Sequence, residues 1–130
     1  MLILLISIRR IIYKINRTGV NLMTVKQFHI EQEENNEAYI LHVSGELDLA
    51  VVQQFRAVLG PIVKQADKIL VLNLKNLSYI DSTGIGIIVS ILKIRDGLQA
   101  PFIVQNIPPA IKRLFDLTGI SGYLTEGTEV

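Results

Sequence analysis

The sequence predicts an α/β fold in which a mixed sheet of four or five strands packs against helices. The expected order is β-β-α-β-α-β-α, with an optional last strand. Runs 27–31 and 38–43 alternate apolar and polar residues, a pattern typical of half-buried strands. After them, apolar runs alternate with segments at helical spacing, which indicates later strands joined by right-handed crossovers. The 130 residues, of which 49% are hydrophobic, suit a single domain with its own core.

The first two strands are expected to form an antiparallel hairpin. Polar residues 33–36 lie between the two alternating runs and are typical of a turn. The alternation breaks at 44–48, Ser-Gly-Glu-Leu-Asp. Asp48 is a suitable N-cap for the helix that follows, because its carboxylate can accept from main-chain N–H groups there.

The first helix is expected to begin after Asp48, since apolar residues that start with Leu49, Val52 and Phe55 then recur at helical spacing and are expected to form its buried stripe. Gly60-Pro61 is expected to kink this helix or end it early. Residues 68–74 contain the aliphatic run Ile-Leu-Val-Leu, of the kind that is buried on both faces of a sheet. We therefore interpret 68–74 as a central strand.

The second helix is expected to follow segment 81–84 and to stop near Gly97. Lys93, Arg95 and Asp96 are interpreted as its solvent-exposed side near the end. Its other residues are apolar nearly all round, which favours a helix packed between the sheet and a neighbouring element. A sharper interpretation is that Ile87 and Ile91 belong to a partner-binding patch.

The last part of the chain is expected to contain a short buried strand at 102–104 and a third helix. Pro108-Pro109 opens this helix, because proline is tolerated in the first turn, and Thr118-Gly119 closes it. Tyr123-Leu124 is expected to form a last short strand or simply to pack. The polar tail from Thr125 is expected to fray.

The composition excludes several classes of function. The chain has no cysteine, so disulfides and thiolate metal sites are excluded and a cytoplasmic location is the simplest expectation. With 13 basic and 12 acidic residues, neither direct nucleic-acid binding nor membrane binding by the main body is expected. An enzyme or nucleotide-binding domain remains the alternative class. It is not favoured, because no Ser–His–Asp set, metal-ligand cluster or P-loop is evident, and no cofactor is expected.

Residues 1–22 differ from the rest of the chain, which is expected to form one domain over 23–130. They carry four basic residues and no acidic one, whereas the remaining residues carry nine basic and 12 acidic. The opening apolar run of eight residues is too short to span a bilayer, which takes about 20 residues in a helix. Three interpretations stay open: a translation-start artefact with the true start at Met23, a basic amphipathic helix resting on a membrane, or an extension that packs on the body or another chain.

The segment Asp81-Ser82-Thr83-Gly84 lies where a strand and its loop lead into a helix. The first amides of a helix have no internal partners, so a phosphate on a hydroxyl here is expected to find hydrogen-bond donors. Gly84 and Gly86 leave room for the backbone of another protein to approach. On local chemistry alone an ordinary N-cap is the simpler interpretation, because Asp, Ser and Thr are all common caps.

Three motifs change this interpretation. Residues 78–86, Ser-Tyr-Ile-Asp-Ser-Thr-Gly-Ile-Gly, resemble the signature of bacterial anti-sigma factor antagonists, which have the STAS fold. Gly45-Glu46-Leu47-Asp48 resembles a second family motif before the first helix, and Arg113-Leu114-Phe115-Asp116-Leu117-Thr118-Gly119 a third in the last helix. The resemblance covers about 24–123, and residues 1–22 fall outside it.

The resemblance implies a regulatory protein and not an enzyme. In that family a kinase that is also the anti-sigma factor phosphorylates the hydroxyl. The unmodified antagonist binds this anti-sigma factor and releases the sigma factor, and a serine/threonine phosphatase resets the switch. Carried over, Ser82 is the expected phosphoacceptor, with Thr83 as its rival. An alternative is a related phospho-switch module in a partner-switching pathway that does not act on a sigma factor.

The same resemblance implies a partner-binding surface around the hydroxyl. Asp48 and Asp81 are expected beside it, and a phosphate would make this patch strongly negative. Regulation is therefore expected to act through the interface and to leave the fold intact. The expected partner-binding residues are Asp48, Asp81, Ser82, Thr83, Gly84, Gly86 and Ile87.

Overall fold

A computed structural model describes residues 27–127, and the predictions for residues 1–22 lie outside this range. Five strands within it form one sheet in the order β1-β2-β3-β4-β5. β1 and β2 are antiparallel, and the other neighbouring strands are parallel. The predicted mixed sheet and order of elements are thus confirmed, with the optional last strand present. The strands are β1 (His29–Glu34), β2 (Ala38–Leu47), β3 (Ile69–Ile80), β4 (Phe102–Gln105) and β5 (Thr125–Gly127).

The hairpin of β1 and β2 turns slightly later than predicted, at 35–37. Asn35 sets the turn, because its side-chain Oδ1 accepts hydrogen bonds from the N–H groups of Glu37 and Ala38, both at 2.8 Å. As a result β1 extends through the polar residues 33 and 34, which had been expected in the turn.

β2 continues to Leu47, beyond the predicted run at 38–43, so the interpretation of 44–48 as a break in the alternating pattern is wrong. Gly45 accommodates an irregularity in the pairing with β3, since it has a φ of 85°, a left-handed conformation that favours glycine. A Cβ at Gly45 would also lie 1.9 Å from the carbonyl oxygen of Gln27. The alternation of buried and half-buried residues in fact continues to Leu47, with Gly45 at one of the buried positions.

β3 is also longer than predicted and continues past 74 to Ile80. Its second half includes exposed polar residues such as Lys75 and Asn76, where the apolar run ends and the register with β2 shifts, but the two strands pair again beyond the shift. Leu47 of β2 pairs with Ile80 of β3. The two strands therefore end side by side, and the residues that follow them, Asp48 and Asp81, leave the sheet at the same edge.

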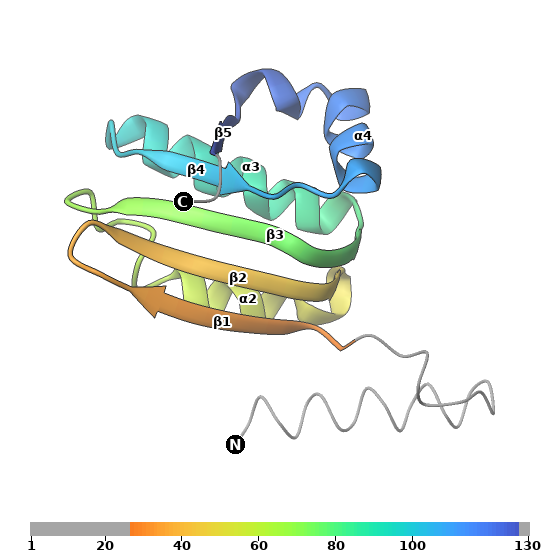
Figure 1. Ribbon diagram of the computed structural model, residues 1–130, viewed down its shortest axis with the longest axis horizontal. Helices are drawn as coiled ribbons and strands as arrows, with labels where there is room; N and C mark the ends of the chain where they lie inside the picture. The colour runs from red at the N-terminus through yellow and green to blue at the C-terminus, as the bar shows by residue number, and fades with distance from the viewer. Residues whose placement is uncertain (1–26, 128–130) are drawn as a thin grey trace.

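Two helices cover one face of the sheet, where Figure 1 shows both behind the strands. A 3-10 turn, η2 (Leu49–Val51), precedes α2 (Val52–Leu59), which ends before Gly60 as predicted. α3 (Ser82–Gly97) begins at the segment singled out in the sequence and ends near the expected stop. Within the described residues, no helix combines the length and the apolar composition that a membrane span requires.

The C-terminal part follows the prediction up to Gly119. α4 (Pro109–Thr118) begins after Pro108, and Gly119 ends it with a φ of 81°. The chain then forms the 3-10 turn η3 (Ile120–Tyr123), so no strand includes Tyr123. The expectation that the tail from Thr125 frays is wrong for residues 125–127. They form β5, because main-chain hydrogen bonds to β4 do not require apolar side chains.

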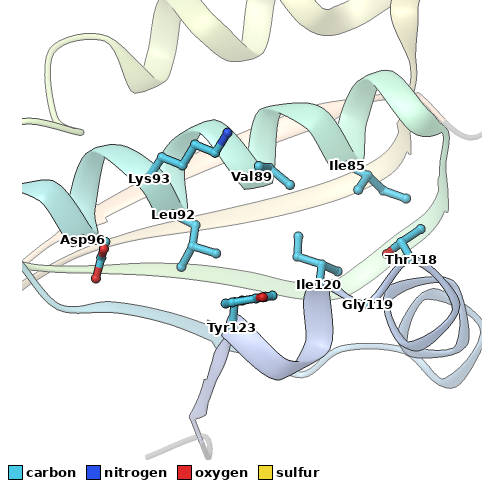
Figure 2. Close-up of a pocket in the computed structure, with 9 residues that line it drawn as sticks. All are labelled: Ile85, Val89, Leu92, Lys93, Asp96, Thr118, Gly119, Ile120 and Tyr123. Atoms are coloured by element: carbon cyan, nitrogen blue, oxygen red, sulfur yellow. The ribbon is translucent and has the colours of Figure 1, made fainter.

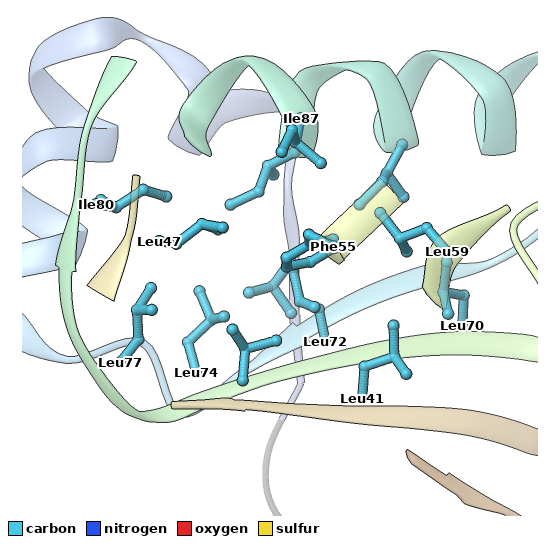
Figure 3. Close-up of a cluster of buried hydrophobic side chains, with 14 of the residues drawn as sticks. Leu41, Leu47, Phe55, Leu59, Leu70, Leu72, Leu74, Leu77, Ile80 and Ile87 are labelled. Carbon is cyan, nitrogen blue, oxygen red and sulfur yellow. The ribbon is translucent and has the colours of Figure 1, made fainter. Parts of the chain in front are cut away.

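The core lies between the sheet and the helices α2 and α3. Figure 3 shows leucines of β2 and β3 facing Phe55 and Leu59 of α2 and Ile87 of α3. Ile87 is only 1% exposed and Ile91 only 2%, so the prediction that they form a partner-binding patch is wrong. The other interpretation of this helix, that it packs between the sheet and a neighbouring element, is correct for these two side chains.

Arg95 also departs from the prediction for α3, since it is 1% exposed and does not lie on the solvent side of the helix. Its guanidinium donates to the main-chain carbonyls of Val63, Gln65, Lys68 and Pro101. Burial lowers the pKa of Arg95, and the charge of Asp67 opposes this effect only in part. Arg95 thus ties the α2–β3 loop to the α3–β4 loop.

Candidate functional site

The candidate site lies where β2 and β3 end, at the edge from which Asp48 and Asp81 depart. Each aspartate caps the helical segment that follows it. Asp48 Oδ1 accepts from the N–H of Ala50 at 3.0 Å, and Asp81 Oδ1 accepts from the N–H of Gly84 at 2.9 Å. The predicted N-cap role of Asp48 is confirmed, and Asp81 performs the same function for α3.

Asp81 also connects the two segments. Its second oxygen, Oδ2, accepts from the N–H of Leu49 in η2 at 3.1 Å, while its own N–H donates to the carbonyl of Leu47 at 3.3 Å. One carboxylate therefore fixes the start of η2 relative to the start of α3. The sequence showed two separate caps, and this bridge between them depends on the pairing of β2 with β3.

The two candidate hydroxyls differ in exposure. Ser82 is exposed at the first residue of α3, whereas Thr83 is half-buried. The expectation that a phosphate here finds unoccupied amides is wrong for the Gly84 N–H, which already donates to Asp81. The N–H of Ile85 likewise donates within the helix, to the carbonyl of Asp81. A group attached to Ser82 would thus compete with Asp81 for the Gly84 amide.

Gly84 and Gly86 serve different purposes. Gly84 is buried, and a Cβ there would lie 2.7 Å from both the carbonyl oxygen of Leu47 and Cγ1 of Ile80. Gly84 therefore permits close packing of α3 on the ends of β2 and β3, and does not form a surface. Gly86 is exposed, with no atom within 4 Å of an added Cβ. Only Gly86 matches the expectation of a glycine that gives a partner access.

Leu49 is a surface residue that sequence reasoning missed. Its side chain is 72% exposed, next to the bridge made by Asp81. The available signal was an apolar residue directly after the Asp48 cap, but the sequence pattern assigned Leu49 to the buried stripe of the first helix. The 3-10 turn rotates it outward, while Val51 and Val52 are buried.

An apolar groove extends from the same helix. Ile85, Val89 and Leu92 follow Ser82 along one stripe of α3, and Figure 2 shows them facing Ile120 and Tyr123 of η3. The groove has a volume of about 620 Å³. Periodicity could not predict it, because its second wall is the 3-10 turn η3.

The geometry suits binding better than metal chemistry. Among the described residues, no three or more histidine, cysteine or acidic side chains come together as a potential metal site. Asp48 and Asp81 accept main-chain hydrogen bonds in helix caps, which explains both carboxylates structurally. The exposed residues of this site are Ser82, Gly86 and Leu49, and the capping hydrogen bonds of Asp48 and Asp81 fix the backbone around them.

Comparisons with known proteins are consistent with this geometry. The family model for the STAS domain matches residues 29–129. A protein of Staphylococcus aureus named anti-sigma-B factor antagonist is 35% identical over 104 residues, which cover 78% of this chain and 96% of the relative. A protein of the same name from Staphylococcus epidermidis is 36% identical over the same shares of both chains.

Solved structures show the same fold. The phosphorylated form of the Bacillus cell fate determinant SpoIIAA is 25% identical, with a TM-score of 0.60, and the match covers 78% of this chain and 92% of that one. The unphosphorylated form of SpoIIAA has a TM-score of 0.64 at 25% identity, over 78% and 89% of the two chains. An anti-sigma factor antagonist from Mycobacterium paratuberculosis has a TM-score of 0.69 at 23% identity, over 76% and 84%.

Proposed function

Because the chain belongs to the STAS-domain family of bacterial anti-sigma factor antagonists, we propose that it binds an anti-sigma factor and thereby frees a sigma factor. The observation that carries the proposal is the exposed Ser82, held at the start of α3 beside the Asp81 bridge. The staphylococcal relatives support the sigma-factor connection, because they are matched over 96% of their length. The protein acts by binding, as a cytoplasmic regulator without a cofactor of its own.

Phosphorylation of Ser82 is the proposed switch. The anti-sigma factor supplies the kinase activity, and a serine/threonine phosphatase restores the hydroxyl. SpoIIAA, at 25% identity, is described in both phosphorylated and unphosphorylated forms, which supports a switch of this kind. Exposure favours Ser82 over its rival Thr83, because a kinase must surround the hydroxyl that it modifies.

The switch acts through charge and bulk at the interface. A phosphate adds about −1.5 to −2 charges, next to the carboxylate of Asp81. Asp81 cannot readily turn away, because both of its oxygens accept main-chain hydrogen bonds. A partner that fits the neutral surface closely would then meet like charge and an extra group, whereas the core below the site would be unaffected.

Substitution of Ser82 should separate the two states of the switch. Ser82→Ala is expected to bind the anti-sigma factor and to resist phosphorylation, whereas Ser82→Asp is expected to bind at least about tenfold more weakly, since about 1.4 kcal/mol of repulsion suffices. Thr83→Ala is the matched control and should still be phosphorylated. The measurements are calorimetric affinity for candidate anti-sigma kinases, and mass spectrometry of the peptide spanning both hydroxyls after incubation with ATP.

Three outcomes would count against parts of this proposal. Failure of Ser82→Ala to bind any anti-sigma factor would overturn the sigma-factor function. Binding instead to a kinase of a pathway without a sigma factor would favour the related phospho-switch module. Global loss of the native amide spectrum on phosphorylation would refute regulation at the interface.

A further inference from the structure

We propose that Leu49 is the apolar anchor of the partner-binding surface around Ser82, and that Asp81 acts as the residue that positions it. This inference rests on the proposed function and specifies the chemistry of its interface. The partner is an anti-sigma factor whose contact face carries an apolar pocket beside the groups that meet Ser82. Asp81 is then a positioning residue and not primarily a contact.

The first argument is the exposure of Leu49. The side chain of Leu49 is 72% exposed. A single exposed leucine is ordinary by itself, and what distinguishes Leu49 is its place directly beside the Asp81 bridge. Its neighbours Val51 and Val52 are only 2% and 7% exposed and hold the turn on the core. The exposed leucine is therefore carried by a firmly packed segment. An apolar side chain on such a segment can fill a pocket of the partner, and the few side chains that fill desolvated pockets carry most of the energy of an interface.

The second argument is the rigidity of the turn. Every main-chain N–H in η2 has a partner. Leu49 donates to Asp81 Oδ2 at 3.1 Å, Ala50 to Asp48 Oδ1 at 3.0 Å, and Val51 to the Asp48 carbonyl at 3.1 Å. A side chain on such a preorganised backbone loses little entropy when a partner covers it.

The third argument is the connection to Ser82. The carboxylate that holds Leu49 also accepts from the N–H of Gly84 in the first turn of α3, at 2.9 Å. Ser82 directly follows Asp81 in the chain and begins that turn. Leu49 and Ser82 are thus fixed relative to each other by one residue. We therefore expect a partner that encloses Ser82 to reach the η2 turn and to cover Leu49 as well.

The test compares polar and apolar replacements of Leu49 in the full chain. Affinity is measured by calorimetry for the anti-sigma factor that binds the Ser82→Ala variant. Leu49→Gln is expected to weaken binding by about tenfold or more, and Leu49→Met, which keeps an apolar side chain, to stay within about threefold. The control is Leu98→Gln, because Leu98 is also exposed, at 43%, but lies at the opposite end of α3. It should bind within about twofold of wild type.

The positioning role of Asp81 has its own readout. Asp81→Asn exchanges one acceptor oxygen for an amide donor, so it can satisfy only one of the two N–H groups. We expect a shifted Leu49 amide resonance and weaker binding. If Asp81 acts through Leu49, the double variant Asp81→Asn/Leu49→Gln should lose little more affinity than the weaker-binding single variant. Fully additive losses would overturn the positioning role.

The inference and the proposed function fail in different ways. If Leu49→Gln binds within about twofold of wild type while Ser82→Asp binds poorly, the anchor is refuted and the proposed function stands. Equal losses for Leu49→Met and Leu49→Gln would also refute the anchor, because its apolar character would then be irrelevant. If wild type binds no anti-sigma factor, both proposals fail together.

Discussion

Replacement of Arg95 by methionine is expected to lower the free energy of unfolding by about 3 kcal/mol or more, the scale seen when buried polar groups lose their partner. Nη1 donates to the carbonyls of Val63 at 3.1 Å and Gln65 at 3.0 Å. Nη2 donates to those of Lys68 at 2.6 Å and Pro101 at 2.8 Å. Methionine fills a similar volume but leaves all four carbonyls without this donor.

Lysine at this position is expected to recover only part of the stability. A guanidinium presents its donors as a planar fork, which suits four acceptors that come from two different loops. A single ammonium group has three donors at one point and cannot reach all of them. The order of stability should therefore be wild type, then Arg95→Lys, then Arg95→Met.

Urea unfolding followed by circular dichroism measures this order. Lys93→Met is the matched control, because Lys93 is an exposed cation on the same helix. It should change the free energy of unfolding by no more than about 0.5 kcal/mol. Equal unfolding midpoints for Arg95→Met and wild type would show that the two loops do not depend on the guanidinium.

Arg95 also shows where sequence reasoning ends. Arg95 was expected to face solvent, because it is charged and lies beside Lys93 and Asp96 in the last turns of a helix. Its actual partners are carbonyls of two loops, one at 63–68, which is 27 to 32 residues earlier in the chain, and one at Pro101, which follows the helix. Hydrophobic periodicity describes strands and helices and carries no information on loop paths. The same limit explains β5, which pairs with β4 through main-chain hydrogen bonds, and η3, in which one buried residue, Ile120, gives no period to recognise.

Regular elements were predictable because burial imposes a period on the sequence. The hairpin, the central strand and three helices follow from that period, and proline and glycine marked the ends of α2 and α4. The period was not informative for α3, because apolar residues lie on nearly all sides of this helix. Periodicity alone could not decide whether Ile87 or Val89 faces the sheet. Packing against α2 and the sheet buries Ile87 and leaves Val89 on the groove.

The candidate site was predictable by residue type but not by arrangement. Asp48 and Asp81 were recognisable as caps, and Ser82 as a hydroxyl at a helix start. Their proximity depends on the pairing of Leu47 with Ile80, which no local pattern encodes. The outward position of Leu49 depends on a 3-10 turn that replaces the expected first turn of the helix. Local rules thus identified the groups, and the sheet register brought them together.

Alanine at Gly84 and alanine at Gly86 are expected to change stability in opposite directions. Both glycines lie in the first turns of α3, where alanine gains about 1 kcal/mol of helix propensity over glycine. At Gly86 nothing opposes this gain, because the space around an added Cβ is empty to 4 Å. Gly86→Ala should therefore be neutral or more stable by up to about 1 kcal/mol.

At Gly84 the steric conflict outweighs the gain. The added Cβ would lie 2.7 Å from the Leu47 carbonyl oxygen, which is main chain and also accepts from the N–H of Asp81. Relief requires α3 to move away from the ends of β2 and β3, and overpacking of this kind costs about 1–3 kcal/mol. We expect a net loss of stability for Gly84→Ala, measured by urea unfolding beside Gly86→Ala.

The variants Gly84→Ala and Gly86→Ala also distinguish an effect on packing from an effect on partner binding. Gly86→Ala keeps the fold, so weaker binding of the anti-sigma factor by this variant would assign Gly86 to the contact surface. For Gly84→Ala, lost binding would be a consequence of lost packing and should accompany a lower unfolding midpoint. If Gly84→Ala instead unfolded like wild type and still failed to bind, Gly84 would be a contact residue after all. The close approach of α3 to Leu47 would then not explain why glycine stands there.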